Sequence, residues 1–201
     1  MKSASQSSRL FIWVAHPRLE SLSKALADAY QSGAIESGSE VRRLDLASME
    51  FDNNFTGYGG GGSPLSPDLQ RWQENVSWSS HLLFVYPYWW GGMPAMAKAV
   101  LDQALLPKFA FKYHRRGLKW DKLLAGKTGD AIITSDTIPW MDTLFYRKPG
   151  RRVIKNQVFD FCGIKPNEIV QFGSVKRSSS ELILKWLDTA HRMGRRLPNA
   201  L

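Results

Sequence analysis

Two short stretches of the sequence carry side chains that could bind or transform a ligand. The first is AHPRLESLSKAL, residues 15–26, in which His16 and Arg18 precede Ser21 and Ser23 at the start of a helical pattern. A helix N-terminus offers unpaired backbone N–H groups and a partial positive charge, so it attracts anions. The loop therefore predicts a phosphate cradle, although Ser21 alone could simply cap the helix.

The second stretch is VYPYWWGGMP, residues 85–94, which places four aromatic rings beside two glycines and two prolines. Pro87 and the glycines let the backbone approach a ligand closely. The rings of Tyr88, Trp89 and Trp90 could wall a flat aromatic ligand, and the alternative is that they pack in the core or at a dimer interface. A planar ring and a phosphate tail, bound across both stretches, would describe a flavin nucleotide.

The elements that must position these loops alternate along the chain. Continuous apolar runs predict strands covered on both faces, and apolar residues at helical spacing predict the intervening helices. The expected strands are 9–15, 40–47, 81–89, 127–136 and 167–175. The expected helices are 21–38, 67–79, 94–106, 149–163 and 178–196, with loops over 48–67 and through the aromatic stretch KFAFKYHRRGLKW.

Alternating strands and helices indicate an α/β fold with a parallel sheet. We expect a flavodoxin-like, doubly wound sheet of five strands in the order 2-1-3-4-5, with helices on both faces. Ligands of such sheets bind beyond the carboxyl ends of the strands, at the switch point between strands 1 and 3. The loops after strands 1, 3 and 4 are therefore the expected site.

Composition limits the function classes. With 201 residues and 43% hydrophobic residues, we expect a single domain over 9–201 after a disordered lead over 1–8. No apolar run approaches the ~18 residues of a transmembrane helix, and Cys162 is expected to be a buried, inert thiol in a cytoplasmic protein. The net charge of +9 comes from short basic clusters without a nucleic-acid-binding or zinc signature. A basic surface that attracts phosphorylated ligands fits better than nucleic-acid binding, and no metal site is expected.

The two stretches, together with the following KFAFKY, resemble the NAD(P)H:quinone oxidoreductase family of flavodoxin-like flavoproteins. The similarity covers about residues 9–195, and its most specific part is YPYWWGGMPAMAKAVLDQAL.

The resemblance implies a site residue by residue. His16, Ser21, Leu22 and Ser23 match the family's loop for the flavin phosphate and ribityl chain. The segment that holds the isoalloxazine ring is matched by Pro87, Tyr88, Trp89, Trp90 and Gly91. Phe111 and Tyr113 match positions that line the substrate pocket, where a second subunit of a homodimer often donates them. The loop after the fourth strand contacts the ring's polar edge, and its matching residues are Thr134, Ser135 and Asp136.

That last loop departs from the family pattern. Animal members have a Thr-Thr-Gly-Gly type sequence there, followed by a tyrosine and a histidine that assist proton transfer, whereas this chain has TSDTIPW. The proton relay therefore cannot be carried over. Asp136 could accept a hydrogen bond from the flavin or cap the next turn, and Tyr146 and His114 are weak candidates for a proton source.

The expected activity is two-electron transfer from NAD(P)H through a bound flavin to a quinone-like acceptor, by a ping-pong mechanism on one shared site. FMN fits better than FAD because the first loop seats one phosphate and no second site for an adenylate is evident; FAD stays open. Two alternatives remain. One is a regulatory ancillary subunit of a potassium-efflux membrane system, as some relatives are, and the other is a one-electron carrier, which the basic charge disfavours.

Overall fold

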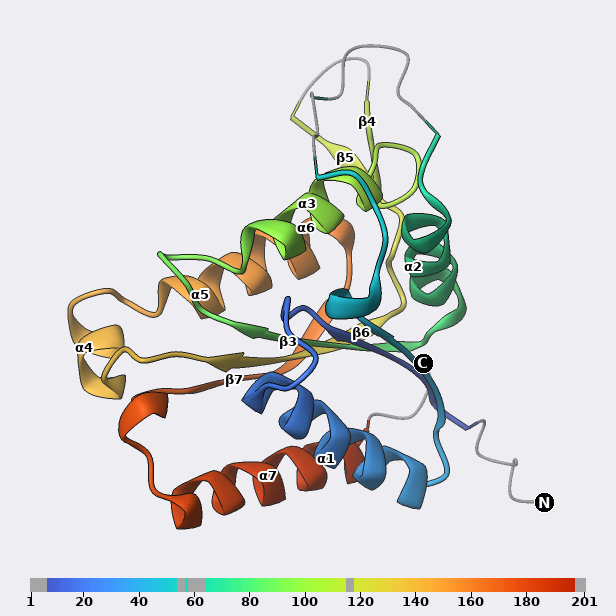
Figure 1. The fold of residues 1–201 in the computed structure, drawn as a ribbon. Coiled ribbons are helices and arrows are strands. Elements are labelled where there is room, and N and C mark those ends of the chain that lie inside the picture. The colour runs from blue at the N-terminus through green and yellow to red at the C-terminus, as the bar shows by residue number, and fades with distance from the viewer. Residues whose placement is uncertain (1–6, 54–56, 58–63, 115–117, 198–201) are drawn as a thin grey trace.

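A computed structural model describes residues 7–53, 57, 64–114 and 118–197. Its centre is a parallel five-stranded sheet in the order β2-β1-β3-β6-β7, which confirms the expected fold (Figure 1). The strands are β1 Arg9–Val14, β2 Glu40–Asp45, β3 His81–Pro87, β6 Thr128–Thr134 and β7 Lys165–Phe172. Each ends one to three residues before the predicted end. The expected lead over 1–8 falls mostly outside the described residues and stays a prediction.

Strand β1 shows why the sheet needs cover on both sides. Phe11 and Trp13 belong to one hydrophobic cluster, whereas Leu10 and Ile12 belong to another on the opposite face. Successive side chains of a strand point to opposite faces, so a continuous apolar run must be buried twice.

Helices cover the two faces as the sequence predicts (Figure 1). On one face lie α1 Leu22–Glu36 and α7 Ser180–Arg195, whose Gly33 and Gly194 allow a close approach. A Cβ on Gly33 would collide with the carbonyl oxygen of His191, and one on Gly194 with that of Tyr30. The backbones of the two helices therefore touch, which larger residues would prevent.

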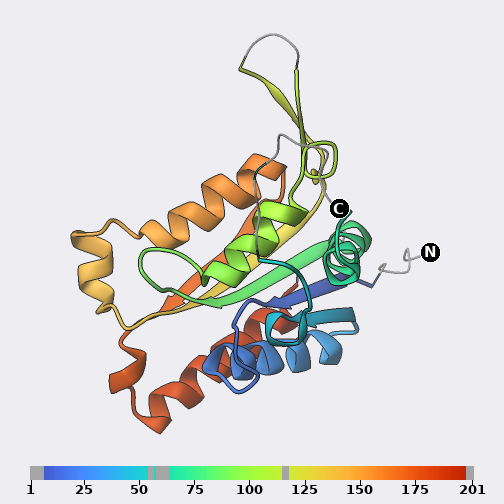
Figure 2. The ribbon, with the colours of Figure 1, turned by 45° about the horizontal axis from the view of Figure 1, so that its top comes forward.

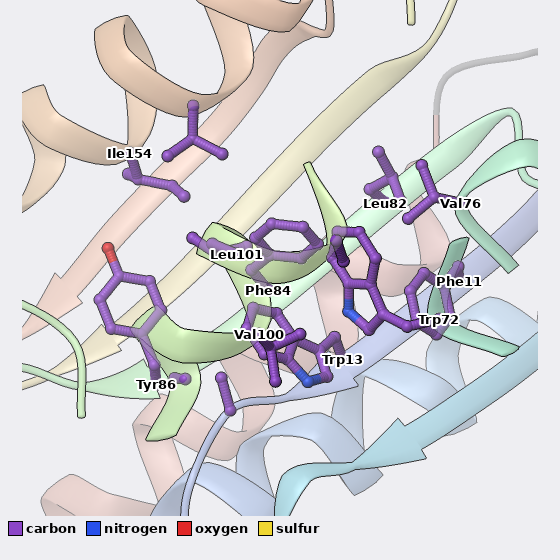
Figure 3. Close-up of a cluster of buried hydrophobic side chains, with 14 of the residues drawn as sticks. Phe11, Trp13, Trp72, Val76, Leu82, Phe84, Tyr86, Val100, Leu101 and Ile154 are labelled. Carbon is purple, nitrogen blue, oxygen red and sulfur yellow. The ribbon is translucent and has the colours of Figure 1, made fainter. Parts of the chain in front are cut away.

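The other face is covered by α2 Pro67–Trp78, α3 Ala95–Ala104 and a third helical stretch over 149–162. That stretch starts as α5 Pro149–Arg152, widens to a π-helical segment, η2 Val153–Phe159, and closes as α6 Asp160–Cys162. Beneath these helices, Trp13, Trp72 and Phe84 pack edge to face or tilted at centroid distances of 5.1 to 6.1 Å (Figure 3). Cys162 is buried as expected, and burial raises the pKa of its thiol to about 11.

One expectation was wrong: the aromatic stretch after α3 is not all loop. It contains an antiparallel hairpin of β4 Phe111–Tyr113 and β5 Trp120–Lys122, which stands away from the main sheet (Figure 2). Trp120 stacks on Phe161 at 4.8 Å, and its indole N–H donates to the Phe161 carbonyl at 2.9 Å. This tertiary contact, which local sequence cannot reveal, holds two three-residue strands in place.

Three short helices were not predicted either. They are η1 Leu46–Ser48, α4 Pro139–Leu144 and η3 Val175–Arg177. Each is a turn or two, too short for a helical period to show in the sequence. No helix in the described part of the chain is long and apolar enough to cross a membrane.

Candidate active site

Two serines lie where the loop after β1 enters α1, and within the described chain only one of them has a hydrogen-bond partner for its hydroxyl. Ser21 is the N-cap, and its Oγ accepts the Lys24 N–H at 3.2 Å. Ser23 is only 1% exposed, and its Oγ has no hydrogen-bond partner among the described residues. A buried hydroxyl without a partner costs free energy, so a ligand that supplies one would be stabilised there.

His16 is held next to this helix start. Its ring is 5% exposed, and Nδ1 accepts the Arg18 N–H at 3.0 Å. Because Nδ1 accepts, the proton of the neutral ring sits on Nε2, which can donate to a ligand. Burial, helped by the Arg18 charge, lowers the pKa of His16 and keeps the ring neutral at neutral pH.

The loop after β3 makes a tight turn whose tip is open. Trp89 and Gly92 exchange both backbone hydrogen bonds, at 2.8 and 3.0 Å, around Trp90 and Gly91. Both tip residues have positive φ, 49° at Trp90 and 83° at Gly91, a conformation that costs a tryptophan roughly 1 kcal/mol. The Trp90 ring is fully exposed, and within the described chain neither tip N–H takes part in a backbone hydrogen bond. The turn therefore offers two free donors and a free ring at one point.

The four rings of the second stretch have different environments. Tyr86 is 2% exposed and belongs to the core, as the packing alternative proposed. Trp89 is 43% exposed and lies edge-on to the His16 ring at a centroid distance of 5.5 Å. This contact joins the two loops at the switch point of the sheet, where the sequence placed the site.

The loop after β6 is the third of the loops expected to border the candidate site. Thr134 is the last residue of β6, pairs with Pro87, and its carbonyl accepts the Tyr88 N–H at 2.7 Å. The Ser135 Oγ accepts the Thr137 N–H at 2.9 Å. Asp136 accepts the Lys176 N–H at 2.9 Å and lies 3.2 Å from the Lys176 Nζ. Asp136 therefore contacts η3, which is neither of the two interpretations, and its hydrogen bond to a flavin stays a prediction.

A cavity of about 620 Å³ opens beside the β3–α3 turn. It brings together four predicted residues, Tyr88, Gly91, Phe111 and Tyr113. The rest of its wall is mostly apolar and comes from α3 and the residues flanking it, from η2 and from α6; it includes Met93, Leu101, Leu105, Val153, Phe161 and Cys162. A mostly apolar cavity of this size, with a few polar groups, suits a flat organic ligand.

The sequence profile of the Flavodoxin-like fold matches residues 8–191, nearly the whole chain. This chain belongs to the flavodoxin-like fold family. An uncharacterized NAD(P)H oxidoreductase of Haemophilus influenzae is 26% identical over 166 residues, which cover 80% of this chain and 81% of the relative.

Two solved structures share the fold of this flavodoxin-like chain. The NAD(P)H:quinone oxidoreductase from Methanothermobacter marburgensis has a TM-score of 0.81 at 23% identity, over 96% of this chain and 100% of the other. An FMN-dependent NADH-azoreductase from Bacillus anthracis, solved in complex with FMN, has a TM-score of 0.71 at 19% identity, over 96% and 100%. These comparisons confirm the family resemblance, and the names of the relatives support an oxidoreductase.

The sequence did not single out a buried carboxylate at the edge of this site. Asp142 of α4 is 2% exposed; one oxygen accepts from Arg151 at 2.7 Å, and the other has no partner among the described residues. Tyr88 lies against Gly150, where a Cβ would come within 2.8 Å of its ring. Burial, and then the Asp142 charge, raises the pKa of the Tyr88 hydroxyl. In the sequence, only Pro139 indicates that a helix starts here. No sequence pattern indicates that Asp142 pairs with Arg151.

The two weak proton-source candidates lie outside the cavity wall. His114 sits on the hairpin and pairs with Asp121 at 2.8 Å, with both side chains about half exposed. Tyr146 follows α4 and is 55% exposed. Among the described residues, no group of three or more His, Cys, Asp or Glu side chains is placed to hold a metal ion.

Proposed function

We propose that this protein is a flavin-dependent oxidoreductase that transfers two electrons from NAD(P)H to a quinone-like acceptor. The observation that carries the proposal is the buried, unpartnered Oγ of Ser23 at the start of α1, beside the joined loops of His16 and Trp89. An uncompensated hydroxyl at a helix N-terminus fits the phosphate of a flavin nucleotide.

The phosphate end would lie on the β1–α1 loop. The Ser23 Oγ and the Nε2–H of His16 would donate to it, while Ser21 keeps its capping bond to Lys24. Leu22, half-buried against the core, fixes the first turn of α1 and thereby the direction of these donors. One helix start seats one phosphate, which favours FMN over FAD.

The ring would lie along the turn after β3. Pro87 and Tyr88 fix the start of this segment through the pairing with Thr134, and the free N–H groups of Trp90 and Gly91 suit carbonyl oxygens. Backbone donors aimed at a developing negative charge stabilise it without reorganisation. Thr134 and Ser135 would border the ring from the neighbouring loop, whereas Asp136 is engaged by Lys176.

When bound, the flavin supplies the redox-active ring, which accepts two electrons from NAD(P)H and passes them to the acceptor in a ping-pong cycle. The cavity beside Gly91 would receive the flat partners, with Phe111 and Tyr113 as aromatic walls. Phe111 and Tyr113 lie edge to face at 5.1 Å, and Tyr113 is 63% exposed. Because the Tyr113 ring is exposed beside an apolar cavity, it supports a homodimer in which the β4–β5 hairpin contacts the second subunit. A cytoplasmic location agrees with the use of NAD(P)H.

The test is NAD(P)H oxidation by the purified protein reconstituted with FMN or with FAD, with menadione as the acceptor. We expect turnover with FMN and parallel lines in double-reciprocal plots, the pattern of a ping-pong mechanism. Replacing Tyr113 by Ala is expected to raise the KM for menadione, because a wall of the cavity is removed. Absence of turnover with both flavins and both nicotinamide cofactors would refute the proposal.

A further inference from the structure

A compact surface around α4 exposes aromatic and aliphatic side chains. Trp140, Leu144, Phe145 and Tyr146 are 56, 70, 69 and 55% exposed. With Arg147, Lys148 and Arg152, which are also exposed, they form what we call the α4 surface. Figure 1 shows α4 projecting past the end of β6, away from the helices on both faces of the sheet. So many large apolar side chains seldom gather on a free surface without a binding function.

The backbone of the turn after α4 holds these side chains outward. The Asp142 carbonyl accepts the Lys148 N–H at 2.8 Å, and the Asp142 side chain pairs with Arg151 at 2.7 Å. These bonds hold Arg147 and Lys148 at positive φ, 56° and 55°, a conformation that is unfavourable for residues other than glycine. The turn after α4 is therefore fixed at a conformational cost, and it turns two cations outward beside the rings.

The charge of this region is strongly one-sided. Residues 139–155 contain five basic side chains and one carboxylate. That carboxylate, Asp142, is buried and already paired with Arg151. The neighbouring η3 adds the exposed Arg177, whereas its Lys176 pairs with Asp136. Lys155 pairs with Asp160. The cations of this region without a carboxylate partner among the described residues are therefore Arg147, Lys148, Arg152 and Arg177. The partner of such a surface must carry negative charge.

We infer that the α4 surface docks the protein on anionic lipid headgroups. Tryptophan, tyrosine and phenylalanine side chains favour the boundary between headgroups and acyl chains, and basic residues around them are attracted to anionic lipids. A second copy of this chain fits less well, because a two-fold contact would place the same cations opposite one another.

This docking also orients the candidate site. The α4 surface lies at the carboxyl end of β6, the same end at which the loops after β1 and β3 meet. A protein bound through α4 would therefore bring this end of the sheet close to the bilayer. The inference does not depend on the proposed redox activity, since lipid binding is measured on the protein alone.

The test is flotation with vesicles of equal parts phosphatidylglycerol and phosphatidylcholine, compared with phosphatidylcholine alone. We expect binding to the first and little to the second, and weaker binding as salt is raised. The double variant R147Q/K148Q is expected to bind about 25-fold more weakly, at about fivefold for each cation removed near the surface. The control K185Q/R192Q removes the same charge from exposed positions of α7 and should bind like the wild type.

A second variant separates insertion of the apolar side chains from simple charge attraction. L144S/F145S keeps every cation and changes two exposed positions, so the fold is expected to persist, and an unchanged melting temperature checks this. We expect at least about a tenfold loss of vesicle binding. The inference would be overturned if both variants bound the anionic vesicles as tightly as the wild type does. It would also be overturned if the wild type bound phosphatidylcholine vesicles as tightly as anionic ones. Stronger binding to a single-stranded oligonucleotide, or a dimer in light scattering that L144S/F145S dissociates, would overturn it as well.

Discussion

The two ends of the central sheet treat their buried polar groups differently. At the amino end, Asp130 of β6 accepts the Tyr30 hydroxyl at 2.7 Å, the Glu168 N–H at 2.7 Å and the Asn167 amide at 3.0 Å. His81 joins the same network through Nε2, at 3.1 Å from the Tyr30 hydroxyl and 3.3 Å from Asp130, and its Nδ1 lies 2.7 Å from the Thr128 Oγ1. The side chains of Tyr30, His81, Thr128 and Asp130 are buried, and each finds a partner within the chain, whereas Asn167 on β7 is exposed.

At the carboxyl end, buried polar groups are left over. The Ser23 Oγ and one oxygen of Asp142 have no partner among the described residues, and the Trp90 ring is fully exposed on a strained turn. A satisfied network stabilises the fold, whereas unsatisfied groups and strain in a folded protein point to a ligand. The comparison thus assigns stability to the Asp130 network and binding to the loops around Ser23, although the Ser8 Oγ at the amino end also has no partner among the described residues.

The largest expected effect is at the amino end. Replacing Asp130 by Asn leaves buried donors of Tyr30 and Glu168 without a charged acceptor, and we expect a loss of about 3–5 kcal/mol in the free energy of unfolding. Urea denaturation measures it. The control Asp188→Asn, at an exposed pair on α7, should change stability by less than about 0.5 kcal/mol. Equal effects of the two substitutions would contradict a structural network at this end.

At the carboxyl end, the expected effect is on affinity. Ser23→Ala should leave the free energy of unfolding nearly unchanged, because the hydroxyl has no partner to lose, but weaken FMN binding about tenfold or more. A flavin-fluorescence titration measures this. The matched control is Ser79→Ala, another buried serine, whose Oγ donates to the Val76 carbonyl at 3.0 Å. Ser79→Ala should lose about 1 kcal/mol of stability and bind FMN as the wild type does. If instead Ser79→Ala weakened FMN binding and Ser23→Ala lost stability, the contrast between the two regions would be wrong.

The pH dependence of stability sharpens the assignment of Asp130. Burial opposes ionisation of this carboxyl, but hydrogen bonds from His81, Tyr30 and the Glu168 N–H outweigh it and hold the pKa below the usual 3.8. A lowered pKa stabilises the fold at pH values above 3.8, and this contribution is lost as the pH falls through the folded-state pKa. The stability difference between wild type and Asp130→Asn should therefore narrow in acid. A difference that widens as the pH falls would mean that the carboxyl is protonated in the fold.

The smallest effect is expected at the turn tip. Trp90→Asn keeps a residue that tolerates positive φ, so stability should stay the same or rise by less than about 1 kcal/mol. Flavin binding should weaken about three- to tenfold, because a ring that can stack is removed. Thermal unfolding and the same titration test both. A clear loss of stability would show that the ring packs on the protein itself.

The sequence predicted the sheet because its strands are continuous apolar runs. RLFIWV and HLLFVYP can only be covered on both faces, and that need fixes a parallel α/β sheet. The β4–β5 hairpin could not be predicted, because its short strands depend on Trp120 stacking on Phe161, far away in the sequence.

The candidate site could be placed from the sequence to the extent that ligand-binding loops follow the carboxyl ends of strands. His16 and Trp89 meet as expected, since strands β1 and β3 are neighbours. The Asp142–Arg151 pair was missed because its formation depends on how α4 packs on α5, which no periodicity records. Asp136 was ambiguous for the same reason: its partner, Lys176, comes from a distant loop.

The central claim is that a flavin binds at the carboxyl end of the sheet, and one measurement tests it most directly. The purified protein is titrated with FMN while its visible absorption and flavin fluorescence are followed, with Ser23→Ala alongside. The account predicts saturable binding with flavin absorption bands, and weaker binding to the variant. A protein that takes up neither FMN nor FAD, or one whose affinity is the same without the Ser23 hydroxyl, would contradict it.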